Sequence, residues 1–266
     1  LDKPLPVQYG IFIRDVLHGN FGKSYIYGKP AMDLIFERMP ATLELVAVAA
    51  CLVLCIAIPL GVYAGAYPKR ASSKLIMSGS ILGISLPSFW VGMMMIYIFA
   101  VVLRLLPASG RGNTVMVGNV ALSIFAPGGI RYVILPAITL ALTNVATMLR
   151  LTRSGILENM RQDYIKFARA KGVPAKSILF GHALKNALIP VVTIFGMDLG
   201  NMIAFTTITE TIFAWPGMGK LLIDAINKSD RPIIVAYLMA AACMFVVLNF
   251  IVDILYTLID PRIELR

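Results

Sequence analysis

The stretch TLELVAVAACLVLCIAIPLGVYAGA, residues 42–66, decides what kind of protein this chain is. Glu44 is its one charged residue, and a run of about 20 apolar residues is long enough to cross a bilayer as a helix. The sequence therefore predicts an all-α membrane protein with five transmembrane helices in this chain. The other four predicted spans have limits near 76–103, 132–150, 186–209 and 232–258.

The composition of the whole chain agrees with this prediction. Of 266 residues, 58% are hydrophobic and 14% are charged, whereas soluble globular domains carry about 25% charged residues. The mean hydropathy of +0.80 argues against a soluble enzyme, a disordered tail and a coiled coil. The net charge of +10 is typical of some nucleic-acid binders, but here the basic residues lie in loops between apolar runs. That distribution favours contact with anionic lipid, so we expect a membrane and no nucleic acid as partner.

The distribution of lysine and arginine predicts which side each loop faces. Residues 150–185 alone hold eight of the 24 basic residues, and loops rich in lysine and arginine stay on the cytoplasmic side of a membrane. With five spans, this orientation places the C-terminus in the cytoplasm and residue 1 on the extracytoplasmic side.

The start of the chain predicts a further helix upstream. The sequence begins without an initiator methionine or a signal peptide, although residue 1 is expected outside. We therefore expect one earlier transmembrane helix, which gives six in the full-length protein. Residues 1–41 are then an extracytoplasmic segment after that helix, and residues 42–266 form the transmembrane domain.

The cytoplasmic loop at about 151–186 contains the most informative stretch, DYIKFARAKGVPAK, residues 163–176. Asp163 suits the first turn of a helix, whereas Gly172 and Pro174 end that helix after about nine residues. A helix this short is marginal alone in water. We expect it to lie across the membrane surface and to be held by its contacts.

One side of this short helix is apolar, at Tyr164, Phe167 and Ala168. Such a stripe fits a groove on a soluble partner. The alternative is an interfacial helix that only anchors the loop through its lysine and arginine side chains. A second amphipathic piece, 177–186, completes a helix–turn–helix elbow suited to transmit a push to the fourth span.

Several motifs in the chain resemble one family. The stretch YIKFARAKG (164–172) followed by HALKNALIP (182–190) looks like the cytoplasmic coupling segment of ABC importer permeases, in the branch that serves dipeptides, oligopeptides and nickel. Further stretches that resemble this branch follow in the same order along the chain: LDKPLPVQYG (1–10), GNFGKS (19–24), PATLEL (40–45), SLPSFWVG (85–92), ETIFAWPGMG (210–219) and VDILYTLIDPRI (252–263).

The resemblance implies the transmembrane domain of a type I ABC importer in a bacterial or archaeal cytoplasmic membrane. The implied partners are a paralogous permease subunit in a heterodimer, two ATP-binding cassette subunits and an extracytoplasmic solute-binding protein. ATP and Mg²⁺ belong to the cassette subunits, and no cofactor is expected on this chain. The residues implied in coupling to the ATPases are Asp163, Tyr164, Phe167, Ala168, Lys171 and Gly172.

The coupling loop departs from the general importer pattern at two positions. Lys166 and Phe167 stand where many permeases have Glu and Ala, whereas Ala168 and Gly172 match the pattern. The departure leaves open which residue makes the main contact with the ATPase.

The chain offers no catalytic constellation of its own. It has no GxxxxGK[ST] stretch to cradle a phosphate. His18 and His182 are expected on opposite sides of the membrane, and neither has a cysteine or second histidine at ligand spacing. We therefore expect a non-catalytic translocation subunit without a metal site, whose ATPase activity resides in its partners.

Asp198 is the acid expected deepest in a span, where ionisable groups are costly and often functional. Asn201 falls on the same helical face. Gly196 and Gly200 flank Asp198 at a spacing that permits close approach of a second helix. We assign Asp198 and Asn201 to the lining of the translocation path. The alternative for Asp198 is a charge pair with Arg150 or with the partner subunit.

Three other acids lie nearer to the ends of spans. Glu210 precedes the turn FAWPG and is assigned to the translocation path, at the outer gate or docking face; the alternative is a helix-end charge in an interface. Glu44 and Asp253 are expected to be solvated or to cap helices. By resemblance, Trp215, Pro216 and Gly217 belong to the surface that meets the binding protein, and an amphipathic helix follows within 216–231.

The predicted function is a permease subunit that imports dipeptides or oligopeptides with ATP hydrolysed by its partners. Nickel, a metal chelate or another small solute is the alternative within the class. A secondary carrier is the rival from another class, but it predicts inverted repeats and more midplane charges than this sequence has.

Overall fold

The structure is a computed structural model that describes residues 4–259, without the side chains of Asp253 and of 255–259. The helices and strands of this part follow in order: α1 (Leu5–Leu17), α2 (Ala31–Ala66), α3 (Ala71–Ser85), α4 (Ser88–Met95), the π-helical η1 (Ile96–Val102), β1 (Val115–Val117), β2 (Val120–Leu122), α5 (Ile130–Asn159), α6 (Asp163–Ala170), α7 (Ala175–Ser177), the π-helical η2 (Ile178–Ala183), α8 (Leu184–Ile212), α9 (Met218–Asn227) and α10 (Arg231–Ile259).

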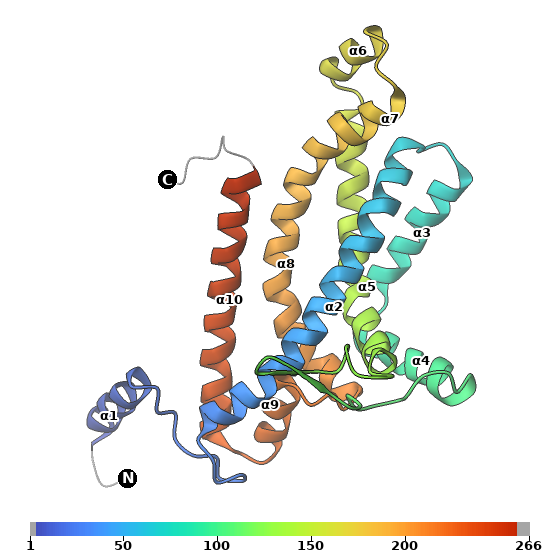
Figure 1. The fold of residues 1–266 in the computed structure, drawn as a ribbon. Helices are drawn as coiled ribbons and strands as arrows, with labels where there is room; N and C mark the ends of the chain where they lie inside the picture. Colours follow the sequence, from blue (N-terminus) through green and yellow to red (C-terminus); the bar gives the residue numbers. More distant parts are fainter. Residues whose placement is uncertain (1–3, 260–266) are drawn as a thin grey trace.

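Four long helices, α2, α5, α8 and α10, form the body of the molecule. α5 packs against both α2 and α8, and α8 also packs against α10. The short helices gather at the two ends of this bundle, with α6 and α7 at one end and α9 and the β1–β2 hairpin at the other (Figure 1). We call these the α6 end and the α9 end.

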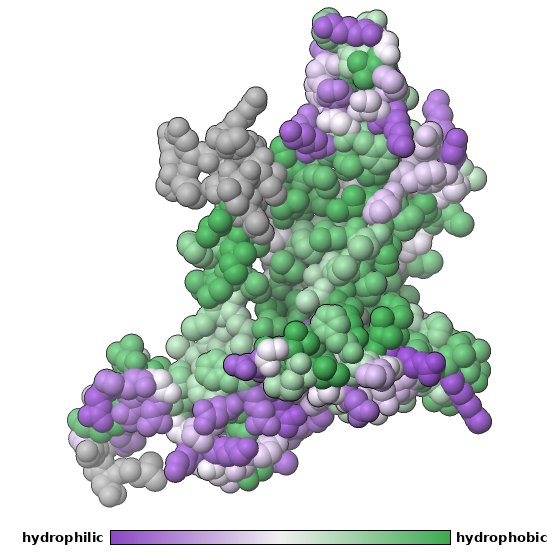
Figure 2. All heavy atoms as spheres, viewed as in Figure 1, coloured by the Kyte–Doolittle hydropathy of each residue, from purple (hydrophilic) through white to green (hydrophobic). Residues whose placement is uncertain are grey.

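The long helices meet the length and composition needed to cross a membrane. Four helical stretches within the described residues qualify: Ala31–Ala66, Ile130–Asn159, Ala175–Ile212 and Arg231–Val252. Figure 2 shows apolar residues in a band across the middle of the visible face and hydrophilic residues at both ends. This pattern is that of a multi-pass membrane protein.

The predicted second span is not one straight helix. α3 and the pair α4–η1 are bent by 105° relative to each other, so they cross the membrane only if the bent pair counts as one span. The break falls at Leu86, whose ψ of 130° is extended. The ring of Pro87 causes this conformation, because proline disfavours the helical conformation of the residue before it. The span predicted at 76–103 is therefore present only as this bent pair, interrupted before Pro87.

α2 begins earlier than the predicted boundary between 41 and 42. It starts at Ala31 and accommodates Pro40 and Pro59 within the helix. Its first turns are held by burial, because Leu34 and Ile35 pack in a cluster with residues of α9 and α10. The extracytoplasmic segment predicted for 1–41 thus already contains the first part of this long helix.

Glycines let the helices approach closely at two places. A Cβ atom at Gly61 of α2 would lie 2.6 Å from the Cβ atom of Thr152 of α5, and one at Gly65 would meet Ile156. On α8, Cβ atoms at Gly196 and Gly200 would collide with side chains of α10. The close approach predicted from Gly196 and Gly200 is confirmed.

A small antiparallel hairpin is the departure from an all-α fold within the described residues. β1 and β2 pair in the register Val115↔Leu122, Met116↔Ala121 and Val117↔Val120. The connecting turn uses Gly118 at φ +62°, a conformation that favours glycine.

Glu44 of α2 fixes the hairpin segment to the bundle. Its side chain is 2% exposed and accepts hydrogen bonds from Arg111, at 2.5 Å, and from the backbone N–H of Ser123, at 2.6 Å. The Arg111 guanidinium also lies 5.6 Å from the ring centre of Trp215. The expectation that Glu44 is solvated or caps a helix was wrong, because a guanidinium far along the sequence neutralises the carboxylate in the interior. Asp253 lies outside the described side chains.

Candidate functional site

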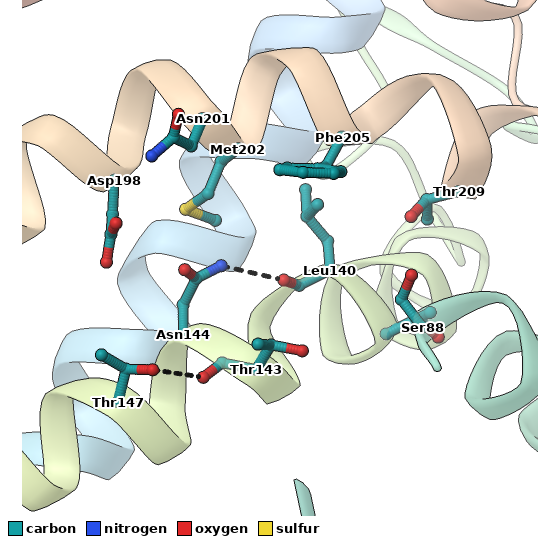
Figure 3. A pocket seen from close by; sticks show the side chains of 11 residues that line it. Ser88, Leu140, Thr143, Asn144, Thr147, Asp198, Asn201, Met202, Phe205 and Thr209 are labelled. Carbon is teal, nitrogen blue, oxygen red and sulfur yellow. Dashed lines mark hydrogen bonds between the residues drawn. The ribbon is translucent and has the colours of Figure 1, made fainter. Parts of the chain in front are cut away.

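A cavity of about 330 Å³ opens between α5, α8 and the start of α4. Figure 3 shows the side chains of its wall, which come from helices that are far apart in the sequence. Most of them are uncharged polar residues, although the cavity lies in an apolar bundle. The lining residues are Ser88, Thr139, Leu140, Thr143, Asn144, Thr147, Asp198, Asn201, Met202, Phe205 and Thr209.

α8 supplies one wall of the cavity. Asp198, Asn201, Met202 and Phe205 follow the spacing i, i+3, i+4, i+7 and therefore share one face of the helix. The glycines of α8 that contact α10 lie on another face. The prediction that Asp198 and Asn201 share a face is confirmed, and this face borders the cavity.

α5 supplies the opposite wall through residues that the sequence analysis did not single out. Thr139, Thr143 and Thr147 stand at four-residue intervals and border the cavity. The hydroxyl of Thr139 donates to the carbonyl of Leu135 at 2.9 Å. Similarly, the hydroxyl of Thr147 donates to the carbonyl of Thr143 at 3.2 Å. These bonds within the helix explain how hydroxyl groups are accommodated in an apolar span.

Asp198 is half-buried at the cavity wall. Among the described residues, no lysine, arginine or histidine forms a salt bridge with it. Arg150, the partner considered from the sequence, is exposed instead. The Asp198 carboxylate therefore faces the cavity without a countercharge from the part of the chain that the structure describes.

Glu210, which was assigned to the translocation path from the sequence, does not line this cavity. Its side chain is fully buried, where Oε1 accepts a hydrogen bond from the Thr42 hydroxyl at 2.6 Å and Oε2 accepts one from the backbone N–H of Lys220 at 2.9 Å. Because Lys220 is in the first turn of α9, the carboxylate occupies the N-terminal end of that helix, where a negative charge is favoured. Glu210 thus joins α8, α2 and α9.

The turn FAWPG is also more buried than the sequence suggested. Trp215 is fully buried and its indole N–H donates to the carbonyl of Ala41 at 2.9 Å, so its side chain is not available to a docking partner in this structure. Pro216 is partly exposed and, with Gly217, borders a pocket of about 200 Å³ at the α9 end. Docking of a binding protein at Pro216 and Gly217 stays a prediction.

The helix predicted at 163–171 is present as α6, and one buried residue fixes it to the rest of the chain. Ile165 is fully buried in a cluster with Val62 of α2 and Ile156 of α5. Ala168 packs against the same cluster, so it does not share the exposed side of the helix with Phe167. Ile165 was not among the predicted coupling residues, although an i, i+3 pair with Ala168 is a signal for a second apolar side.

The outward side of α6 is formed by Phe167, which is 61% exposed, together with Lys171 and Gly172. The Lys171 ammonium lies 4.5 Å from the centre of the Phe167 ring. Asp163 is exposed and forms an ion pair with Lys166 at 2.7 Å, and this partner lowers the pKa of the Asp163 carboxyl. An apolar ring beside cationic groups is therefore presented at the tip of the molecule.

Tyr164 connects α6 to two long helices. Its hydroxyl donates to Asn159 Oδ1 of α5 at 2.7 Å and accepts from Asn186 Nδ2 of α8 at 3.0 Å. α5 and α8 are the same two helices that form the walls of the cavity. Tyr164 thus joins α6 to the two helices that supply these walls.

The part of the chain that the structure describes contains no group of three or more His, Cys, Asp or Glu side chains that could hold a metal ion. His182 lies in η2 at the α6 end, whereas His18 follows α1. The two histidines therefore belong to different regions of the molecule.

Proteins of known family resemble this chain over nearly its whole length. It is 40% identical to the oligopeptide transport system permease protein AppB of Bacillus subtilis, over 99% of this chain and 82% of that protein. It is 38% identical to the probable D,D-dipeptide transport system permease protein DdpB of Escherichia coli, over 99% and 81%. The dipeptide transport system permease protein DppB of Escherichia coli is 36% identical, over 99% and 82%.

A solved structure has the same fold. The MetNI methionine ABC transporter in an inward-facing conformation matches with a TM-score of 0.66 and 16% identity, over 86% of this chain and 97% of that one. The fold is therefore that of an ABC importer transmembrane domain. Residues 57–265 match the family described as binding-protein-dependent transport system inner membrane component. Together with the relatives above 30% identity, this match shows that the chain belongs to the family of binding-protein-dependent transport system inner membrane components.

Proposed function

We propose that this chain is the membrane-spanning permease subunit of an ABC importer for dipeptides or oligopeptides. The observation that carries the proposal is a cavity with polar walls inside an apolar bundle, in a chain whose relatives are named as peptide permeases. The chain itself is a translocation subunit, and ATP with Mg²⁺ is used by partner subunits.

The proposed orientation places the α6 end in the cytoplasm and the α9 end outside. Arg161, Lys166, Arg169, Lys171 and Lys176 all lie at the α6 end, where a positive excess marks the cytoplasmic side. In this orientation the pocket beside Pro216 and Gly217 faces the solute-binding protein, and α6 faces an ATP-binding cassette subunit. A paralogous permease completes the transmembrane dimer.

The proposed mechanism couples the ATPases to the cavity through α6. ATP-driven closure of the two cassette subunits moves α6, which is held to this chain by Ile165 and by the Tyr164 hydroxyl. Because the Tyr164 hydroxyl forms hydrogen bonds with both α5 and α8, a movement of α6 changes the distance between the cavity-lining faces of these two helices. When the cassette subunits close, the cavity opens toward the binding protein. When they separate again, it opens toward the cytoplasm.

The experiment is to purify the complete transporter with its partner subunits and to reconstitute it in proteoliposomes. Phe167→Asp places a charge on the outward side of α6, so we expect loss of the ATPase subunits on co-purification and loss of peptide uptake. Phe125→Asp is the matched control, because Phe125 is 65% exposed at the α9 end. Its complex should retain the ATPase subunits.

Two results would contradict the proposal. If the Phe167→Asp complex retains its ATPases and its uptake, α6 is not the coupling contact. If the wild-type complex hydrolyses ATP and imports a metal chelate but no peptide, the substrate class is wrong and the architecture stands.

A further inference from the structure

The walls of the cavity are rich in hydrogen-bond acceptors. The hydroxyl protons of Thr139 and Thr147 are donated to carbonyl groups of α5, and Asn144 donates its amide N–H to the carbonyl of Leu140 at 3.3 Å. Their oxygen lone pairs remain available. At these three positions a solute therefore meets oxygen acceptors, while the two hydroxyl protons and one amide N–H of Asn144 are already engaged.

The cavity also carries a negative charge that no described residue neutralises. Asp198 borders the same space, and its carboxylate is directed toward α5 from the α8 wall (Figure 3). Asn144 and Thr147 lie across from it on α5. Lysine, arginine and histidine are all missing from the described lining. A carboxylate within a membrane span is costly without a partner, so the solute is the natural source of the opposite charge.

We infer that this cavity contains a subsite for a cationic donor group of the transported solute, with Asp198 as the charge partner and the oxygens of Asn144 and Thr147 as additional acceptors. An ammonium group fits this chemistry, because it has three N–H donors and no acceptor. The inference rests on the proposed function and narrows its substrate class to peptides with a basic side chain. The membrane subunit thus contributes to selectivity after the binding protein has released the solute.

The test is a competition for uptake by the reconstituted complete transporter. Two tripeptides that differ only in a central lysine or glutamate are offered together, each at equal concentration on its binding protein. The ratio of the two uptake rates reports selectivity. We expect the wild type to favour the lysine peptide. Asp198→Asn should lower the ratio of lysine-peptide uptake to glutamate-peptide uptake about tenfold, because the loss of a hydrogen bond to a charged group weakens binding by at least this factor.

Two further variants make the result specific. Asp198→Glu keeps the charge and should keep most of the preference for the lysine peptide. Asp33→Asn removes the same charge from an exposed position of α2 and should leave the ratio unchanged.

Each failure has a separate meaning. An unchanged ratio in Asp198→Asn overturns the subsite, even if both peptides are imported. Loss of the assembled complex in Asp198→Asn also overturns it and assigns the carboxylate to a pairing with the partner subunit. If the wild type imports neither peptide, the proposed function itself has failed.

Discussion

At the scale of single residues, the bundle depends on carboxylates that are buried together with their partners. Glu44 and Glu210 lie in the interior near the α9 end, and each joins a long helix to a segment distant in sequence. Removing one partner of a buried charge is more damaging than replacing both, because the remaining charge is left without compensation.

Arg111→Met is expected to destabilise the protein by about 2 to 3 kcal/mol, because Glu44 retains only its hydrogen bonds to Ser123 and Ile124. The measurement is the midpoint of thermal unfolding of the purified complex in detergent. The double variant Glu44→Gln/Arg111→Met should recover part of the loss. Arg14→Met, at a residue with a 68% exposed side chain, should change little. Equal midpoints for Arg111→Met and Arg14→Met would contradict this assignment.

At the scale of elements, the close contact between α2 and α5 depends on glycines, because a residue without a side chain lets the two helices approach. Gly61 and Gly65 face Thr152 and Ile156, and the carbonyl oxygen of Leu149 lies 2.9 Å from the place of a Cβ atom at Gly61. A backbone carbonyl cannot move aside like the end of a flexible side chain. The two helices would therefore have to separate if Gly61 were replaced.

Gly61→Ala should lower stability by about 1 to 3 kcal/mol, although alanine favours the helix more than glycine does. Gly79→Ala on α3 is the matched control, because no atom lies within 4 Å of the added Cβ atom. The control should be neutral or slightly stabilising. Thermal unfolding of the two variants side by side checks the expectation, and a stabilised Gly61→Ala would show that the helix contact is looser than described.

The sequence predicted the long helices because a membrane span needs only length and apolar composition. It could not predict the ion pair of Glu44, since Arg111 is 67 positions away and its loop has no regular pattern. The angle of the break at Pro87 could not be predicted, because it depends on the packing of α3 and α4 against α5. Asp198 and Asn201 were found through helical spacing. The threonines of α5 were missed, although their four-residue interval was visible in the sequence.

At the scale of the whole molecule, one hydroxyl group connects the tip of the α6 end to both walls of the cavity. Tyr164 reaches Asn159 and Asn186, while Phe167 on the same helix faces outward. In the proposed mechanism, attachment to the ATPase subunit and transmission to the cavity are thus carried by different residues of α6.

Tyr164→Phe should therefore separate ATP hydrolysis from transport. The ring remains, so the ATPase subunits should still co-purify, but two hydrogen bonds are lost. We expect the amount of solute imported per ATP hydrolysed to fall about fivefold. This factor corresponds to a net hydrogen-bond free energy of about 1 kcal/mol. Tyr9→Phe, at an exposed tyrosine of α1, is the control. An unchanged ratio of uptake to hydrolysis in Tyr164→Phe would exclude this route of transmission.

The ion pair that fixes the hairpin segment has a consequence for biogenesis. During synthesis, α2 is made before Arg111, so its Glu44 carboxylate enters the membrane region with no countercharge from its own chain. An unpaired charge is costly within a bilayer, and this cost lasts until the segment that carries Arg111 has been synthesised. The buried ion pair can therefore close only after the chain has been made as far as residue 111.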